Sequence, residues 1–142
     1  MGLWNRFGVR KQEEAAAASF DAEEDARIAG LEKLLESEDI GTRWRAVRAF
    51  GEMGVGSPAV DALKQTVHDG DATVRCGALQ ALADLPAGDL FLEALGDDDP
   101  RVRRCAIAGV KRSGDERGIE GLVGLLRDPD EQVRSLAADA LS

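Results

Sequence analysis

The chain has 142 residues and a formal net charge of -9, because 27 acidic side chains outnumber 18 lysines and arginines. That length suits one domain, and the acidic excess argues against a surface that binds nucleic-acid phosphates and favours basic partners. Aromatic residues make up 4% of the chain and Tyr is absent, which favours closely packed helices over a β-sandwich.

The N-terminal segment, residues 1–23, lies outside the repeated pattern of the rest of the chain. It combines aromatic and basic side chains near its start, which are Trp4, Arg6, Phe7, Arg10 and Lys11. Such a segment can be a flexible tail or a cap over the first helix. It can also dock to a partner or to an anionic membrane surface, and the sequence leaves these alternatives open.

A pattern of about 30 residues recurs four times in the rest of the chain. Each copy has an Asp four residues before an Arg, an Ala three residues after the Arg, and a large apolar residue seven after it. These spacings define one face of a helix, and the small alanines predict close contacts between helices. The copies contain Asp39 and Arg43 with Ala46, Asp71 and Arg75 with Ala78, Asp99 and Arg103 with Ala106, and Asp130 and Arg134 with Ala137.

A second apolar pattern precedes each copy, so every unit consists of two short helices, B with the second pattern and A with the Asp and Arg. Helical spacing directs the B pattern toward the core at Ile28, Leu31, Leu34 and Leu35, at Val60, Leu63, Thr66 and Val67, and at Ile119, Leu122, Leu125 and Leu126. In chain order the sequence predicts a B helix over 24–37, then A over 42–53, B over 58–68, A over 72–84, B over 88–96, A over 100–112, B over 116–127 and A over 131–141.

The pattern Asp-x-x-x-Arg-x-x-Ala-x-x-Ala-Leu resembles the short HEAT-like repeats named after phycobilisome lyase subunits, over roughly residues 25–142. Three positions depart from it: Gly109 replaces an Ala, Thr42 replaces a Val, and the first copy lacks the Asp-Pro start. The resemblance implies an all-α, right-handed α-solenoid of about eight helices in antiparallel pairs over 24–142. In such a solenoid B helices line the concave side and A helices the convex side.

The stretch "GDDDPRVRR" is interpreted as framework. Asp99 precedes Pro100, which suits an N-cap aspartate followed by proline at the first helical position. Arg103 lies one turn further, where it can pair with Asp99 or with the matching Asp of an adjacent repeat. Stacked copies therefore predict an Asp/Arg ladder with largely buried arginines. A metal site is not favoured, because these carboxylates belong to separate repeats.

Residues that could carry catalysis are scarce. His68 is the only histidine, and the chain has no phosphate-binding GxxxxGK[ST] loop and no CxxC motif. Repeat enzymes that resemble deoxyhypusine hydroxylase hold two irons with several His-Glu pairs, and no such pair occurs here. We therefore expect no enzymatic activity, no cofactor and no metal. The resemblance leaves a regulatory or accessory, lyase-like subunit of an enzyme complex as an alternative.

The sequence also leads to expectations about the cellular location of the protein and the state of its two cysteines. No apolar run approaches the roughly 20 residues of a membrane-spanning helix, and the start lacks the features of a signal peptide, so we expect a cytoplasmic protein. Cys76 and Cys105 cannot form a disulfide framework or a four-ligand zinc site, and both are expected to be buried free thiols.

The expected function is a scaffold or adaptor that holds a protein partner on the concave B-helix side. Helical phase places an acidic rim there, with Leu92 and Val123 as an apolar centre, which suits a basic or amphipathic protein segment. The candidate partner-binding residues are Glu32, Asp61, Lys64, Asp89, Leu92, Glu93, Glu120, Val123 and Arg127. A solvated face without a ligand is the plainer alternative.

The last A helix has no B helix after it in the sequence. One face of "VRSLAADAL" then has no partner inside the chain. Either this alanine-rich face tolerates water, or it forms a two-fold homodimer through the C-terminal helix.

Overall fold

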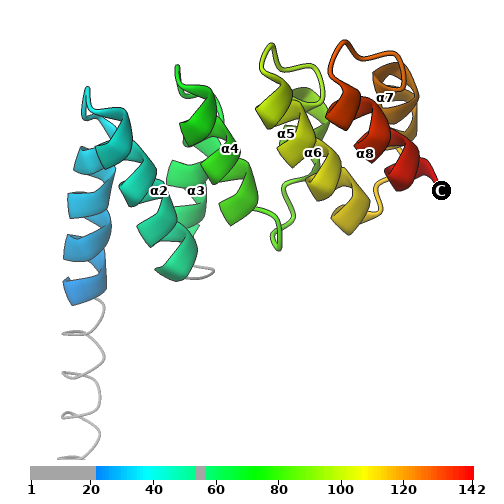
Figure 1. The fold of residues 1–142 in the computed structure, drawn as a ribbon. Coiled ribbons are helices and arrows are strands. Elements are labelled where there is room, and N and C mark those ends of the chain that lie inside the picture. Colours follow the sequence, from blue (N-terminus) through cyan, green and yellow to red (C-terminus); the bar gives the residue numbers. More distant parts are fainter. Residues whose placement is uncertain (1–21, 54–56) are drawn as a thin grey trace, which may run out of the picture.

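The computed structural model describes residues 22–53 and 57–142, and within these ranges it contains eight helices and no strand (Figure 1). The chain is helical over 22–35. The helices that follow are α2 (Ile40–Met53), α3 (Ser57–Thr66), α4 (Ala72–Ala81), α5 (Gly88–Ala94), α6 (Pro100–Ser113), α7 (Gly118–Leu125) and α8 (Glu131–Leu141). The predicted alternation of B and A helices is confirmed. The expectations for Trp4, Arg6, Phe7, Arg10 and Lys11 lie outside the described residues.

The helices form an all-α solenoid of antiparallel pairs. Figure 1 shows the A helices α2, α4, α6 and α8 side by side in one layer, with the B helices in a second layer behind them. Consecutive A helices pack against one another, and each A helix also packs against a B helix. None of the helices in the described ranges is long and apolar enough to cross a membrane.

The small alanines of the repeat lie in the interior of the solenoid. Ala46, Ala78, Ala106 and Ala137 are all buried, as predicted. The larger apolar residues of the same faces fill the space between the layers, and the most buried of them are Phe50, Leu79, Leu82, Phe91 and Ile107. One hydrophobic core therefore runs along the whole described solenoid.

Aspartates begin three of the A helices. Asp71, Asp99 and Asp130 are extended N-cap residues whose carboxylates accept backbone N–H groups of the first turn. Pro100 follows Asp99 at the first helical position, so the predicted cap is confirmed. Gly114 ends α6 with a φ of 64°, a left-handed conformation that glycine adopts without steric cost.

Three residues predicted to face the core are exposed instead. Leu34, Ile119 and Leu126 are more than a third exposed, and each belongs to the first or the last B helix of the described chain. The equivalent of Leu126 one unit earlier, Leu95, is only 6% exposed. The expectation was wrong because helical phase defines which face a residue occupies, whereas burial also requires a neighbouring unit.

Cys76 on α4 and Cys105 on α6 form a disulfide across the A layer. The expectation of buried free thiols is therefore wrong, and both side chains are only half-buried. Stacking of α4 beside α6 brings the two Cα atoms to 5.9 Å, a separation that suits a disulfide.

Candidate functional site

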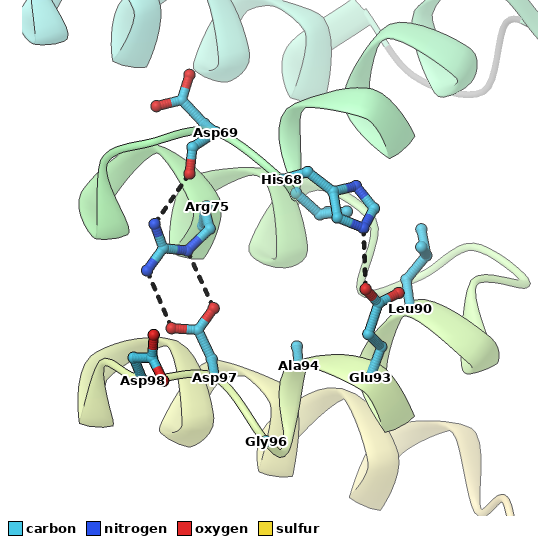
Figure 2. A pocket seen from close by; sticks show the side chains of 10 residues that line it. His68, Asp69, Arg75, Leu90, Glu93, Ala94, Gly96, Asp97 and Asp98 are labelled. Atoms are coloured by element: carbon cyan, nitrogen blue, oxygen red, sulfur yellow. Dashed lines mark hydrogen bonds and ion pairs between the residues drawn. The ribbon is translucent and has the colours of Figure 1, made fainter.

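A ladder of arginines and aspartates links consecutive units. Arg43 donates from Nε to Asp69 at 2.9 Å, and Arg75 donates from Nε and Nη2 to Asp97, both at 3.0 Å (Figure 2). The third link has the same geometry, because Arg103 Nη2 donates to Asp128 at 2.9 Å. Each arginine belongs to one A helix and each aspartate to the turn before the next A helix.

The predicted ladder was wrong about the carboxylates. We expected Asp39, Asp71, Asp99 and Asp130 to pair with the arginines, but these residues accept backbone N–H groups at the start of their own helices. Backbone N–H groups of the first helical turn bind these carboxylates. Each ladder arginine therefore binds the aspartate that lies two residues before the N-cap aspartate of the next A helix. The repeat of Asp69, Asp97 and Asp128 before three of the four caps was the signal in the sequence.

Each ladder arginine also donates to a backbone oxygen in the turn that precedes its own A helix. Arg75 Nη1 donates to the backbone oxygen of Asp69 at 2.9 Å (Figure 2), and the bond to Asp97 raises the pKa of the Arg75 guanidinium. Burial acts to raise the pKa of Asp128, but hydrogen bonds from Arg103 and from the Asp130 N–H outweigh it, so that pKa is lowered. The ladder is therefore a charged, hydrogen-bonded framework along the turns.

The outward surface of the B helices, here called the B face, contains the candidate partner-binding residues. The structure leaves Glu32, Asp61, Lys64, Asp89, Glu93, Glu120, Val123 and Arg127 exposed. Asp61, Asp89 and Glu120 stand at the same position in α3, α5 and α7, eight residues before Asp69, Asp97 and Asp128 respectively. The B face therefore presents one acidic side chain per unit in three consecutive units.

A hollow of about 410 Å³ separates the end of α3 from α5 on this surface (Figure 2). His68 lies on its α3 side and Glu93 on its α5 side, and His68 Nε2 is 3.1 Å from a Glu93 carboxylate oxygen. The Arg75–Asp97 pair of the ladder borders the same hollow. Each nitrogen of the Arg75 guanidinium donates a hydrogen bond, whereas the His68 and Glu93 side chains are exposed.

A second ion pair crosses from α5 to the start of α7. Arg117 Nη1 donates to Asp89 at 2.9 Å, and the same guanidinium binds Asp115. The hydrogen bonds that Arg117 donates to Asp115 and then to Asp89 raise the pKa of Arg117, and the bonds that Asp115 accepts from Arg117 lower the pKa of Asp115. Sequence reasoning did not include Arg117 among the candidates, although it lay within the B helix predicted over 116–127. Its pair with Asp89 depends on how α5 and α7 are placed in consecutive units.

The predicted apolar centre of Leu92 and Val123 does not form as expected. Leu92 is half-buried at the junction of α5 and α7, where its Cδ2 lies 3.4 Å from the place that a Cβ on Gly118 would occupy. Val123 occupies the matching position in the last unit and is 51% exposed. Leu92 is therefore only partly available at the surface, and the B face is polar over α3 and α5.

No set of three or more His, Cys, Asp and Glu side chains in residues 22–53 and 57–142 is placed to hold a metal ion. None of the curated proteins compared with the chain matches it significantly.

Solved structures similar to the chain include a designed repeat protein and two engineered proteins. A designed armadillo repeat protein in complex with the peptide (KR)4 is 18% identical, with a TM-score of 0.64 over 83% of this chain and 64% of that one. Two crystal structures of engineered proteins are 26% and 25% identical, with TM-scores of 0.60 and 0.57 over 81% and 80% of this chain. The chain covers 61% and 62% of those two structures, so it spans about three fifths of their length.

A family model described as HEAT repeats matches residues 28–89 and again residues 86–142. These two matches span nearly all of the described solenoid. The chain therefore belongs to the HEAT-repeat family.

Proposed function

We propose that the chain is a non-enzymatic scaffold or adaptor that binds a basic segment of a partner protein along its B face. The observation that carries the proposal is the row formed by Asp61, Asp89 and Glu120, one acidic side chain at the same position of each successive B helix. Solenoid proteins mostly act through such extended surfaces. Within the HEAT family we propose the short repeat type found in phycobilisome lyase subunits.

The spacing of the row suits an extended cationic segment. The A helices of consecutive units pack against one another, which corresponds to a repeat of about 8 to 10 Å along the solenoid, and a polyproline II segment advances about 9 Å per three residues. A segment with Lys or Arg at every third residue would therefore present one cation to each acidic side chain of the row. Such pairs form at an exposed surface, so they contribute modestly one by one and mainly raise the association rate.

The three acidic side chains of the row differ in whether they already have an ion-pair partner. Asp89 is paired with Arg117, whereas Asp61 and Glu120 form no ion pair with any described residue. Glu93, beside the row, is paired with His68. A basic segment must therefore displace Arg117 to reach Asp89, and we expect Asp61 and Glu120 to contribute most of the affinity.

The armadillo design supports the proposal in one respect. Its complex with (KR)4 demonstrates that a helical solenoid of this general fold can hold a peptide of alternating Lys and Arg. The acidic side chains of the B face provide this chain with charges complementary to such a peptide.

The test is fluorescence anisotropy with a labelled peptide that has Lys at every third residue. We expect the variant with Asp61→Asn and Glu120→Gln to bind about tenfold more weakly than the wild type, as for the loss of two exposed ion pairs. The matched control is Glu38→Gln with Glu131→Gln, which makes the same change in net charge away from the B face.

Equal weakening in the two double variants would mean that only net charge attracts the peptide, and the proposal would be rejected. Unchanged binding in the Asp61 and Glu120 variant would reject it as well. A variant with Arg117→Gln is expected to bind more tightly, because Asp89 no longer has a competing partner.

A further inference from the structure

A hollow of about 520 Å³ lies between α4 and α6, in the middle of the A layer. The two helices lie side by side in Figure 1. The residues that line this α4–α6 hollow come from α4, from the turn after it and from α6, and none comes from a B helix. They include Arg101, Arg104 and Arg112, and none of the described lining residues is acidic. The chain has a formal net charge of -9, so a cationic hollow is a local exception to its overall charge.

The residues that meet at this junction explain why the space is open. At the preceding junction the ring of Trp44 on α2 lies against α4, with Cδ1 3.5 Å from the place that a Cβ on Gly77 would occupy. Cys76 stands at the equivalent position of α4, one residue after the ladder arginine. There the disulfide to Cys105 joins the two helices. A disulfide fills less space than an indole ring, so the second junction keeps a hollow.

The three arginines form a row along one face of α6. They are spaced three and then eight residues apart, and both spacings return to nearly the same side of an α-helix. With a rise of about 1.5 Å per residue, the row extends over about 16 Å. A ligand that binds all three must therefore be elongated along α6 and must carry anionic groups along its length.

The arginines differ in whether they already have a partner. Arg104, in the middle of the row, is half-buried and has no ion-pair partner among the described residues. Arg101 Nη2 donates to Asp99 at 2.9 Å, and Arg112 Nε lies 3.1 Å from Asp84. The side chains of Arg101 and Arg112 are 54% and 62% exposed. Exposed pairs contribute little, so carboxylates of a ligand can compete for both arginines.

We propose that the α4–α6 hollow binds an acidic, amphipathic α-helix of a partner protein. Charge complementarity defines its acidic side chains, which are spaced three and eight residues apart because parallel helices share one rise per residue. Its apolar side chains enter the hollow over Leu79, Ala83 and Ala108. An amphipathic helix in an apolar groove is a common mode of peptide recognition. The site lies on different helices from the B face, so it does not rest on the function proposed there.

A nucleic acid fits the hollow less well than an acidic helix. Nucleic-acid affinity comes mainly from the neutralisation of many phosphates, whereas this row has three cations on a chain of net charge -9. A sugar-phosphate backbone would also leave the apolar side chains of Leu79 and Ala108 without a partner. An acidic amphipathic helix complements both the arginines and the apolar floor.

The probe is a labelled, alanine-rich helical peptide that carries Glu at the spacing of the three arginines and Leu beside them. Fluorescence anisotropy measures its binding to the full chain with the disulfide formed. We expect saturable binding that weakens about tenfold in the variant Arg104→Gln with Arg112→Gln, as for the loss of two exposed ion pairs. The matched control is Arg27→Gln with Lys33→Gln, which makes the same change in net charge at exposed residues of the first described helix.

A second pair of variants tests the hollow without changing charge. Ala108→Phe fills the space from α6, and we expect at least about tenfold weaker binding. Ala138→Phe is its control, because Ala138 is also an exposed alanine on an A helix but does not line the hollow. A peptide of the same composition with its Glu residues on different faces should also bind at least about tenfold more weakly. This comparison of peptides needs only the wild-type chain, so it does not depend on the folding of any variant.

Three results on the peptide would overturn the proposal. The first is equal weakening in the two charge variants, which would mean that only net charge attracts the peptide. The second is equal binding to the Ala108→Phe and Ala138→Phe variants, which would place the peptide outside the hollow. The third is equal binding of the two peptides, or no saturable binding of either.

Other occupants of the hollow would overturn it as well. A labelled single-stranded oligonucleotide that binds more tightly than the peptide, and loses this binding in the Arg104 and Arg112 variant, would assign the hollow to nucleic acid. Self-association in light scattering that the same variant abolishes would assign it to a second copy of this chain. The variant with Asp61→Asn and Glu120→Gln should bind the acidic peptide no more weakly than the wild type, so the failure of either proposal leaves the other standing.

Discussion

Arg103 on α6 and Asp128 before α8 form the most enclosed ion pair of the ladder, with Nε 2.8 Å from the carboxylate and side chains that are 12% and 5% exposed. The arginine comes from one unit and the aspartate from the next, so neither unit alone can satisfy the pair. The relationship makes the stability of each unit depend on its neighbour.

The ladder predicts unequal effects at two equivalent arginines. Arg103→Ala should lower the free energy of unfolding by about 3 kcal/mol, because it leaves a buried carboxylate without its cation. Arg134→Ala should cost about 1 kcal/mol or less, because it breaks only hydrogen bonds to backbone oxygens at the surface. Urea denaturation followed by circular dichroism measures both, and equal losses would contradict the ladder.

The packing of α5 against α6 predicts a cost for adding one methyl group. Gly109 replaces the small alanine of the other A helices, and the ring of Phe91 occupies the space that a Cβ there would fill. Gly109→Ala should therefore destabilise the chain by about 1 to 2 kcal/mol through overpacking.

Gly124→Ala is the control for this change. Gly124 lies within α7, and nothing lies within 4 Å of the place of its Cβ. This substitution should stabilise the chain by up to about 1 kcal/mol through helix propensity. Thermal denaturation of the two variants checks the difference in sign.

The aspartates predict a loss of stability in acid. Hydrogen bonds from Arg101 lower the pKa of Asp99 from 3.8 to about 2, and the pKa of Asp128 is also lowered. Carboxyl groups with lowered pKa values in the folded state stabilise it above their unfolded pKa values. That contribution disappears as the pH falls through the folded values. The free energy of unfolding should therefore fall between about pH 4 and pH 2, as checked by urea titrations across this range.

Asp99→Asn isolates part of this effect. The variant should depend less on pH between about pH 4 and pH 2, because it lacks one titrating carboxylate. If its stability fell as steeply as that of the wild type, Asp99 would not contribute to the acid dependence.

The disulfide predicts a redox-dependent stability. Cys76 and Cys105 close a loop with a sequence separation of 29, for which the chain-entropy estimate is about 3 to 4 kcal/mol. The double variant Cys76→Ser with Cys105→Ser should lose most of this contribution and should not respond to reductant. Because disulfides persist mainly in oxidising compartments, thiol trapping in intact cells would also test the cytoplasmic location expected from the sequence.

The sequence predicted the helices well because its signals are local. The Asp99–Pro100 pair marks a helix start whatever surrounds it, and the spacing from Arg103 to Ala106 and Val110 defines one helix face. These relations span fewer than three helical turns, so they do not depend on how units stack.

What the sequence could not provide depends on stacking. Asp97 and Asp99 lie two residues apart, and the position of Arg75 on the neighbouring unit decides which of them it binds. The disulfide similarly depends on the register of α4 against α6. On the B face, Leu92 is half-buried because it lies beside Gly118 of another helix, a contact that depends on how the two units stack.

The disulfide makes the junction between α4 and α6 different from the other junctions between A helices. The bond clamps the two central A helices at one point of their junction, whereas the junctions of α2 with α4 and of α6 with α8 are held by noncovalent contacts. We therefore expect bending of the solenoid to be concentrated at the two outer junctions. A ligand that spans the whole B face would adjust the curvature at the ends, while the middle serves as a stiff segment of fixed pitch.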